Sequence, residues 1–249
     1  MFPEWLGFIE LIMLLITSFL GSLITASMGL GGGVLLLAVL TQFIPAVAVI
    51  PVHGVVQLGS NIGRAGLMRH FIDIRICLYF LVGSVIGAIA GGQIAFTLEP
   101  DYLRLLIALF IFWSIWRPNI VIGYSSKLVI FLGGFVSTVL TMFVGATGPF
   151  VATLLRTQKY GREQQVATMA ACMVLQHLLK VMVFVTLGFV LTDYIGLITV
   201  MVATGFVGTL IGKRLLLKAN ERQFNIILNV MLVLLAGRLL WISTLNLFG

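Results

Sequence analysis

Apolar residues occur along the chain in long blocks that are separated by short polar or glycine-containing connections. Eight blocks of about 15 to 25 residues can form helices that cross a hydrocarbon core about 30 Å thick. Two further blocks, 34–44 and 149–156, are too short to be assigned as crossings. The eight long blocks are 6–28, 46–63, 74–97, 102–116, 120–144, 165–190, 194–212 and 224–248. This pattern predicts an all-α polytopic membrane protein with about eight long transmembrane helices plus two short segments.

The composition supports a place in the lipid bilayer. Of the 249 residues, 60% are hydrophobic and 9% are charged, whereas soluble domains carry about 25% charged residues. So few charges cannot cover a water-exposed surface, which excludes a soluble enzyme and a disordered protein. The net charge of +7 does not indicate a nucleic-acid partner, because the basic residues of membrane proteins collect in cytoplasmic loops.

A glycine-rich break precedes each short block and predicts an internal repeat. The first break reads Met28-Gly-Leu-Gly-Gly-Gly33 and the second reads Val144-Gly-Ala-Thr-Gly-Pro149. An offset of 116 positions aligns Thr25 with Thr141, Gly29 with Gly145, Gly32 with Gly148, Asn61 with His177 and Arg64 with Lys180. Later in the chain an offset of 121 aligns Gly87 with Gly208 and Gly91 with Gly212. We interpret residues 1–118 and 119–249 as two transmembrane repeats of one integral membrane domain.

The loop charges predict that the two repeats have opposite orientations. In the first half, Arg64, Arg69 and Arg75 crowd the connection that follows block 46–63. The equivalent connection of the second half holds only Asp193. The basic residues of the second half lie instead in its other two connections, at Arg156, Lys159, Arg162, Lys213, Arg214, Lys218 and Arg222. The positive-inside rule then predicts inverted repeats with both termini external. Eight plain helices in two parallel halves would place several basic loops on the wrong face.

The two breaks are candidate anion sites. Irregular backbone at membrane depth occurs where it lines a protein-enclosed cavity, and short helices starting after Gly33 and at Pro149 would point their N-termini into it. Free N–H groups and the helix dipole favour an anion there. The candidate residues are Gly31, Gly32, Gly33, Gly145, Thr147 and Gly148. The alternative is that these small residues only allow close helix packing, which is the interpretation we favour for Gly83, Gly87 and Gly91.

Polar side chains within the long blocks form two stripes. His53, Gln57 and Asn61 recur at intervals of four residues, which places them on one helix face with Arg64 one turn further on. The second half carries Gln176, His177 and Lys180 on neighbouring positions of one face. Each stripe offers hydrogen-bond donors and a cation, which a desolvated oxyanion requires. Alternatively, Arg64 reaches the membrane surface as a topology marker, and the histidines are structural.

The acidic residues lie almost entirely in or near loops. Only Glu10 could sit within the bilayer among the eight acids. This placement argues against carboxylate-based cation transport or a carboxylate proton relay. If transport is coupled to protons, His53 and His177 would carry them, because histidine titrates near physiological pH.

The break Gly29-Leu-Gly-Gly-Gly33, the later His53, Gln57, Ser60-Asn61 and Gly63-Arg64, and the echo at 145–149 resemble the TauE/SafE sulfite exporter family over almost the whole chain. The resemblance implies a secondary transporter of the bacterial inner membrane that exports sulfite, sulfoacetate or a related organosulfonate. It also implies that the glycine breaks and the His53–Arg64 stripe line the path. The second break lacks the triple glycine, so the two half-sites are chemically unequal. The transporter can be a monomer or a homodimer.

Two other functions are open at this point. An anion-selective channel would use the same residues. An intramembrane enzyme is less favoured, because Cys77, Cys172 and the histidines do not occur at ligand spacing. We therefore expect no catalytic residue, no cofactor and no metal site.

Overall fold

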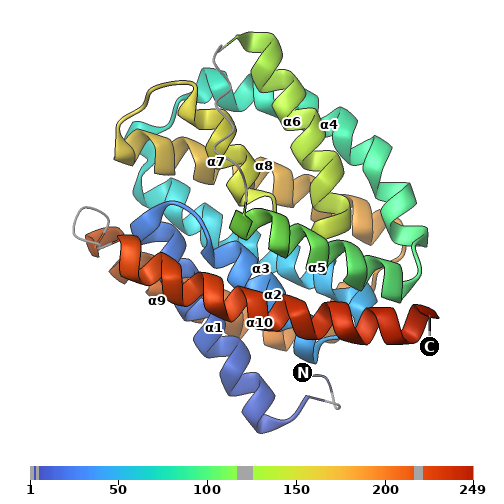
Figure 1. Cartoon of the computed structure of the whole chain (residues 1–249). Coiled ribbons are helices and arrows are strands. Elements are labelled where there is room, and N and C mark those ends of the chain that lie inside the picture. The colour runs from blue at the N-terminus through green and yellow to red at the C-terminus, as the bar shows by residue number, and fades with distance from the viewer. Residues whose placement is uncertain (1–2, 4–5, 117–125, 216–220, 249) are drawn as a thin grey trace.

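The computed structural model describes residues 3, 6–116, 126–215 and 221–248, with the backbone alone at 221–225 and 227. These residues form ten α-helices and two short 3-10 helices (Figure 1). The helices are α1 (Phe8–Met28), α2 (Gly32–Phe43), α3 (Ala46–Leu67), η1 (Arg69–Phe71), α4 (Ile74–Thr97), α5 (Pro100–Trp116), α6 (Lys127–Val144), α7 (Gly148–Arg156), α8 (Arg162–Thr186), η2 (Leu191–Tyr194), α9 (Ile195–Leu215) and α10 (Glu221–Phe248). The expected repeat boundary at 118/119 lies outside the described residues.

The helix lengths confirm an all-α polytopic membrane protein. Seven described helices, α1, α3, α4, α6, α8, α9 and α10, are long and apolar enough to cross a membrane. The block 102–116 forms α5, whose 17 residues lie at the lower end of the range that spans a bilayer. The two short blocks form α2 with 12 residues and α7 with 9, which at about 1.5 Å per residue are too short to cross.

One long helix ends before its apolar block does. The block 165–190 predicts a helix up to residue 190, but α8 ends at Thr186. Gly188 has a φ of +105°, a left-handed conformation in which glycine commonly ends helices. The glycine therefore stops the helix although apolar residues continue beyond it.

The glycine breaks end α1 and α6 in the same way. Gly29 and Gly145 have φ values of +87° and +77°, which glycine tolerates because it has no Cβ. The N–H of Gly29 donates to the carbonyl of Thr25 at 2.9 Å, and that of Gly145 donates to the carbonyl of Thr141 at 3.0 Å. The two breaks are thus similar in backbone conformation although their sequences differ.

The short helices start slightly earlier than expected. α2 begins at Gly32 instead of after Gly33, with Gly31 as the preceding residue at a φ of +100°. α7 begins at Gly148, so Pro149 lies in its first turn. Proline is favourable there, because the N–H that it lacks would have no partner within the helix.

The long helices pack in pairs that join distant parts of the chain (Figure 1). α1 packs against α9 and α4 packs against α6, while α3 packs against α8 and α5 against α10. Glycines bring the first two pairs close. A Cβ at Gly87 on α4 would overlap the carbonyl of Phe135 on α6, and a Cβ at Gly208 on α9 would overlap that of Phe19 on α1. The glycine stripe of α4 therefore serves helix packing, as its spacing predicts.

The basic connections meet at one end of the bundle. The hydroxyl of Tyr160, which precedes α8, donates to the carboxylate of Asp73 before α4 at 2.6 Å. The ammonium of Lys213 at the end of α9 donates to the carbonyl of Leu67 at the end of α3, at 2.8 Å. In Figure 1 these connections lie at the left, and the C-terminal end of α10 lies at the right.

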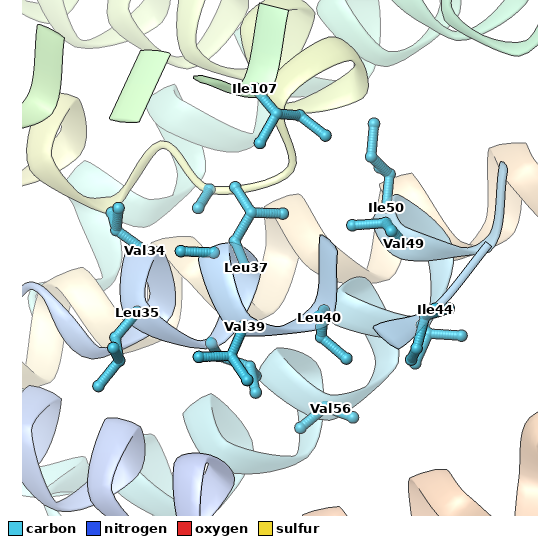
Figure 2. Packing of buried hydrophobic residues seen from close by; sticks show 14 of the residues in the cluster. Val34, Leu35, Leu37, Val39, Leu40, Ile44, Val49, Ile50, Val56 and Ile107 are labelled. Atoms are coloured by element: carbon cyan, nitrogen blue, oxygen red, sulfur yellow. The ribbon is translucent and has the colours of Figure 1, made fainter. Parts of the chain in front are cut away.

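Apolar side chains fill the opposite end, and we call this group the apolar plug. The plug comprises Leu36, Leu40, Ile44, Val49, Ile50, Ile107 and Ile111. These side chains come from α2, α3 and α5, apart from Ile44, which directly follows α2, and none is more than 4% exposed. Figure 2 shows most of them packed around α2. Because α3 starts at the plug and ends at the basic connections, the two lie at opposite ends of the bundle.

We expect the Tyr160→Phe variant to be less stable than the parent by about 1 kcal/mol, because it removes a partly exposed, charge-assisted hydrogen bond. Burial acts to raise the pKa of Asp73. The hydrogen bonds from Tyr160 and from the N–H groups of Ile76 and Arg75 outweigh it, so the pKa lies below its usual value of 3.8. A depressed carboxylate pKa stabilises the fold above pH 3.8, and this contribution is lost as the pH falls through the folded-state value.

Thermal unfolding in detergent at several pH values measures this difference. The gap in melting temperature between the parent and Tyr160→Phe should be largest above about pH 5 and should close below pH 3.8. The Tyr102→Phe variant is the matched control, since Tyr102 is exposed. A gap that is constant from pH 3 to pH 7 would contradict the assignment.

Candidate functional site

A small inner cavity lies between the two glycine breaks. Its volume is about 30 Å³, which is room for about two or three water molecules. The lining residues come from both breaks and from α1, α2, α3, α7 and α8. They are Thr25, Leu30, Gly31, Gly33, Val34, His53, Gln57, Asn61, Arg64, Ala146, Thr147, Gly148, Pro149, Met169, Met173 and His177. Nine of the thirteen candidate residues from the sequence therefore line one cavity.

A larger cavity, which we call the vestibule, adjoins it on the side of the basic connections. The vestibule has a volume of about 540 Å³, and its wall includes Arg156, Tyr160 and Arg162. Gly31 and Met169 line both cavities. The inner cavity is thus the deep end of a space whose mouth carries cationic side chains.

Arg64 lies at the inner cavity and not at the membrane surface. Its side chain is 1% exposed, which rules out the alternative of an arginine reaching the headgroups. One guanidinium nitrogen donates to Oδ1 of Asn61 at 3.1 Å and another to Oγ of Ser60 at 3.4 Å. Its Nε has no hydrogen-bond partner among the described residues. The guanidinium is therefore held in place with donor capacity left over.

No carboxylate accompanies Arg64 or Lys180 in the described part of the chain. The ion pair found there joins Arg104 to Asp101, near the start of α5. A buried cation without a counter-ion is unfavourable by several kcal/mol. The arrangement is chemically incomplete and would be completed by a small anion.

The two histidines approach each other across the cavity. The ring centroids of His53 on α3 and His177 on α8 are 5.9 Å apart, with an interplanar angle of 74°. Nε2 of His53 lies 3.0 Å from the carbonyl oxygen of Gly33. Nδ1 of His177 is buried without a hydrogen-bond partner among the described residues. His177 can therefore bind a ligand through that nitrogen, whereas His53 also fixes the first turn of α2.

Gln176 supports the second break from behind. Its Oε1 accepts a hydrogen bond from the hydroxyl of Thr147 at 2.8 Å. Its Nε2 donates to Ser137 at 3.0 Å and to Thr138 at 3.1 Å, both on α6. The side chain is fully buried but does not line the inner cavity. Gln176 instead holds Thr147 in place, and Thr147 does line the cavity.

Lys180 also lies behind the cavity wall. Its ammonium donates to the carbonyl of Gly145 at 2.7 Å, and its side chain is fully buried. Gly32 and Gly145 likewise do not line the cavity. Gly32 packs against the backbone of Gly21 on α1. Four of the thirteen candidates therefore lie outside the inner cavity, and the other nine line it. The four are Gly32, Gly145, Gln176 and Lys180.

Seven lining residues were not among the candidates from the sequence: Thr25, Leu30, Val34, Ala146, Pro149, Met169 and Met173. Ser60 lies beside the cavity, where its hydroxyl is 2.9 Å from that of Ser22 and accepts from Arg64. Its position four residues before Arg64 places it on the same helix face, which was a usable signal. The hydroxyl of Thr25 donates to the carbonyl of Gly21 one turn earlier in α1, at 2.8 Å. The two methionines resemble ordinary core residues, so only the packing of α8 reveals them.

This geometry, with paired breaks around a cationic cavity, is accompanied by a match over most of the chain. The family model described as "Sulfite exporter TauE/SafE" matches residues 14–239. The chain belongs to the TauE/SafE family. No curated protein and no solved structure matches it. TauE/SafE proteins are anion exporters of membranes, so this TauE/SafE chain is a membrane transporter.

Proposed function

We propose that this TauE/SafE protein is a secondary transporter that exports a small sulfur-containing anion by alternating access. One observation carries the proposal: Arg64 is buried at the inner cavity without a carboxylate partner. The first turns of α2 and α7 border the same cavity and favour negative charge through their free N–H groups. A cation and two helix N-termini together suit an oxyanion that has given up its water.

The size of the inner cavity favours sulfite or the sulfonate head group as the bound part of the substrate. A volume of about 30 Å³ limits the bound part to a compact group of a few heavy atoms. The carbon chain of sulfoacetate or another organosulfonate would extend past Met169 and Val34, which line both cavities. A chain with a second anionic end would then reach Arg156 at the mouth.

The orientation that we propose places the vestibule on the cytoplasmic side of the bacterial inner membrane. Arg156 and Arg162 line the vestibule, and cytoplasmic loops carry the excess of basic residues. The C-terminal end of α10 lies near the start of α5, where Asn246 donates to Asp101 at 3.2 Å. That end is opposite to the basic connections, which is consistent with external termini.

The two halves are proposed to be inverted repeats that exchange roles during transport. Support comes from the helix pairs. The packing of α1 against α9 in one region is repeated by the packing of α6 against α4 in another. The repeat offset maps α1 onto α6 and α4 onto α9. Where protons accompany the anion, His53 and His177 are the titratable groups that meet at the cavity.

Flux in proteoliposomes tests this function. Purified protein should give saturable sulfite or sulfonate uptake, and the rate should approach a maximum as the anion concentration rises. In parallel, sulfite, sulfoacetate and taurine should be compared with sulfate, thiosulfate and chloride for their effect on the melting temperature, since a bound ligand raises it. An unsaturable flux would indicate an anion channel. No flux and no thermal shift with any of the sulfur anions would reject the proposal.

A further inference from the structure

The vestibule wall and the apolar plug occupy corresponding positions in the two halves of the chain. At the offset of 116 that relates Gly29 to Gly145, wall residues of α7 and α8 correspond to plug residues of α2 and α3. Arg156 corresponds to Leu40, and Gln165 corresponds to Val49. The first member of each pair lines an open space, whereas the second is at most 1% exposed.

The same relation holds for the last helix of each half, α5 in the first and α10 in the second. At the offset of 121 that relates Gly87 to Gly208, Leu228 and Leu232 of α10 correspond to Ile107 and Ile111 of α5. The two α10 residues line the vestibule, and the two α5 residues belong to the plug. The seven plug residues are thus members of a larger buried apolar cluster that correspond to residues of the vestibule wall.

The two buried cations, Arg64 and Lys180, also differ between the open half and the closed half. Arg64 and Lys180 are counterparts at the offset of 116. Lys180 donates to the carbonyl of Gly145, the break glycine of the closed half. Arg64 instead lines the inner cavity, and Gly29, the counterpart of Gly145, lines the vestibule. One cation is engaged with the backbone on the closed side, and the other is available to an anion on the open side.

We propose that the apolar plug is a second vestibule in its closed state and that Lys180 is the residue that binds the anion when it opens. In the oppositely open state the plug side chains separate, and Lys180 leaves the carbonyl of Gly145 and faces the cavity. Arg64 then takes the equivalent place beside Gly29. The inference rests on the proposed alternating access and adds the gate and the second binding cation. A dry plug of branched side chains also prevents ion leakage while the vestibule is open.

Cysteine accessibility tests the plug. The background carries Cys77→Ala and Cys172→Ala, which remove the two buried native thiols. Val49→Cys probes the plug, its counterpart Gln165→Cys probes the vestibule, and Ile130→Cys is a fully buried control outside both. A membrane-impermeant maleimide is applied to right-side-out and to inside-out vesicles. Val49→Cys should react from the membrane side opposite to Gln165→Cys, and Ile130→Cys should not react.

The labelling result is independent of the substrate assignment. Flux of sulfite with an unreactive Val49→Cys would overturn the gate while leaving the proposed function standing. Reaction of Val49→Cys and Gln165→Cys from the same side would also overturn it. Labelling from opposite sides without any sulfite or sulfonate flux would support the gate and reject the substrate class.

Lys180 is tested by separating binding from transport. The Lys180→Met variant should keep the thermal shift that sulfite produces, because Arg64 is intact in the vestibule-open state. Its flux should fall about a hundredfold or more, the scale expected when a buried charge partner is removed. Lys180→Arg should recover part of the flux. Loss of the thermal shift in Lys180→Met, or parental flux in that variant, would overturn the assignment.

Discussion

Replacement of Arg64 by methionine is expected to abolish anion transport and, at the same time, to raise the melting temperature of the anion-free protein. The guanidinium is buried with no carboxylate partner among the described residues, so it stabilises a bound anion and destabilises the empty protein. Loss of a buried charge partner weakens binding by about 2–5 kcal/mol. Replacing a buried ionic group with an apolar one is often neutral or stabilising, by about 1–4 kcal/mol.

Flux in proteoliposomes and thermal unfolding with and without sulfite measure the two effects in one preparation. The Arg69→Met variant is the matched control, because Arg69 is exposed in η1 and should change neither quantity. Arg64→Lys keeps the charge but loses the forked geometry, so it should retain some binding. Parental flux in Arg64→Met would refute the assignment, as would a melting temperature that falls together with flux.

The second large effect concerns Gly32, where alanine is expected to prevent stable folding. A Cβ at this position would lie 2.5 Å from Oγ1 of Thr25 and would overlap the backbone carbonyl of Gly21. Overpacking typically costs about 1–3 kcal/mol, and more is expected here because α1 would have to move as a whole. We expect Gly32→Ala to give little monodisperse protein and a strongly lowered melting temperature.

Gly148→Ala provides a control at the equivalent position of the other break. Both glycines are the first residues of short helices, so the change in helix propensity is the same. A Cβ at Gly148 would meet only Cε of Met169, at 3.4 Å, which is an ordinary contact with a flexible side chain. Size-exclusion chromatography and thermal unfolding of the two variants should differ clearly. Equal stabilities would show that α1 and α2 are not packed as described.

The helices could be predicted from the sequence because each long apolar block is set off by charge, glycine or proline. The breaks were visible for the same reason, since a cluster such as Gly31 to Gly33 is unfavourable inside a continuous helix. Exact ends were harder. α8 stops before its apolar block because Gly188 adopts a positive φ, and hydropathy does not report backbone conformation.

The candidate site could be predicted only in part. Spacing placed Gln57, Asn61 and Arg64 on one face of a helix, and that face does line the cavity. Spacing also grouped Lys180 with His177, but Lys180 turns to the carbonyl of Gly145. Periodicity along a helix defines a direction around its own axis. It does not define which backbone group of another helix lies there, and that depends on how α6 and α8 meet.

The absence of acidic side chains from the described cavity walls has an electrical consequence. With no carboxylate to bring a cation along and with the cations fixed to the protein, the anion is the charge that moves wherever no proton from His53 or His177 accompanies it. Each negative charge that leaves a cell gains about 2.3 kcal/mol per 100 mV of inside-negative potential. We therefore expect the membrane potential alone to drive export in the proposed orientation. A potassium gradient and an ionophore set the membrane potential. Reversing the sign of this potential should reverse the direction of sulfite movement.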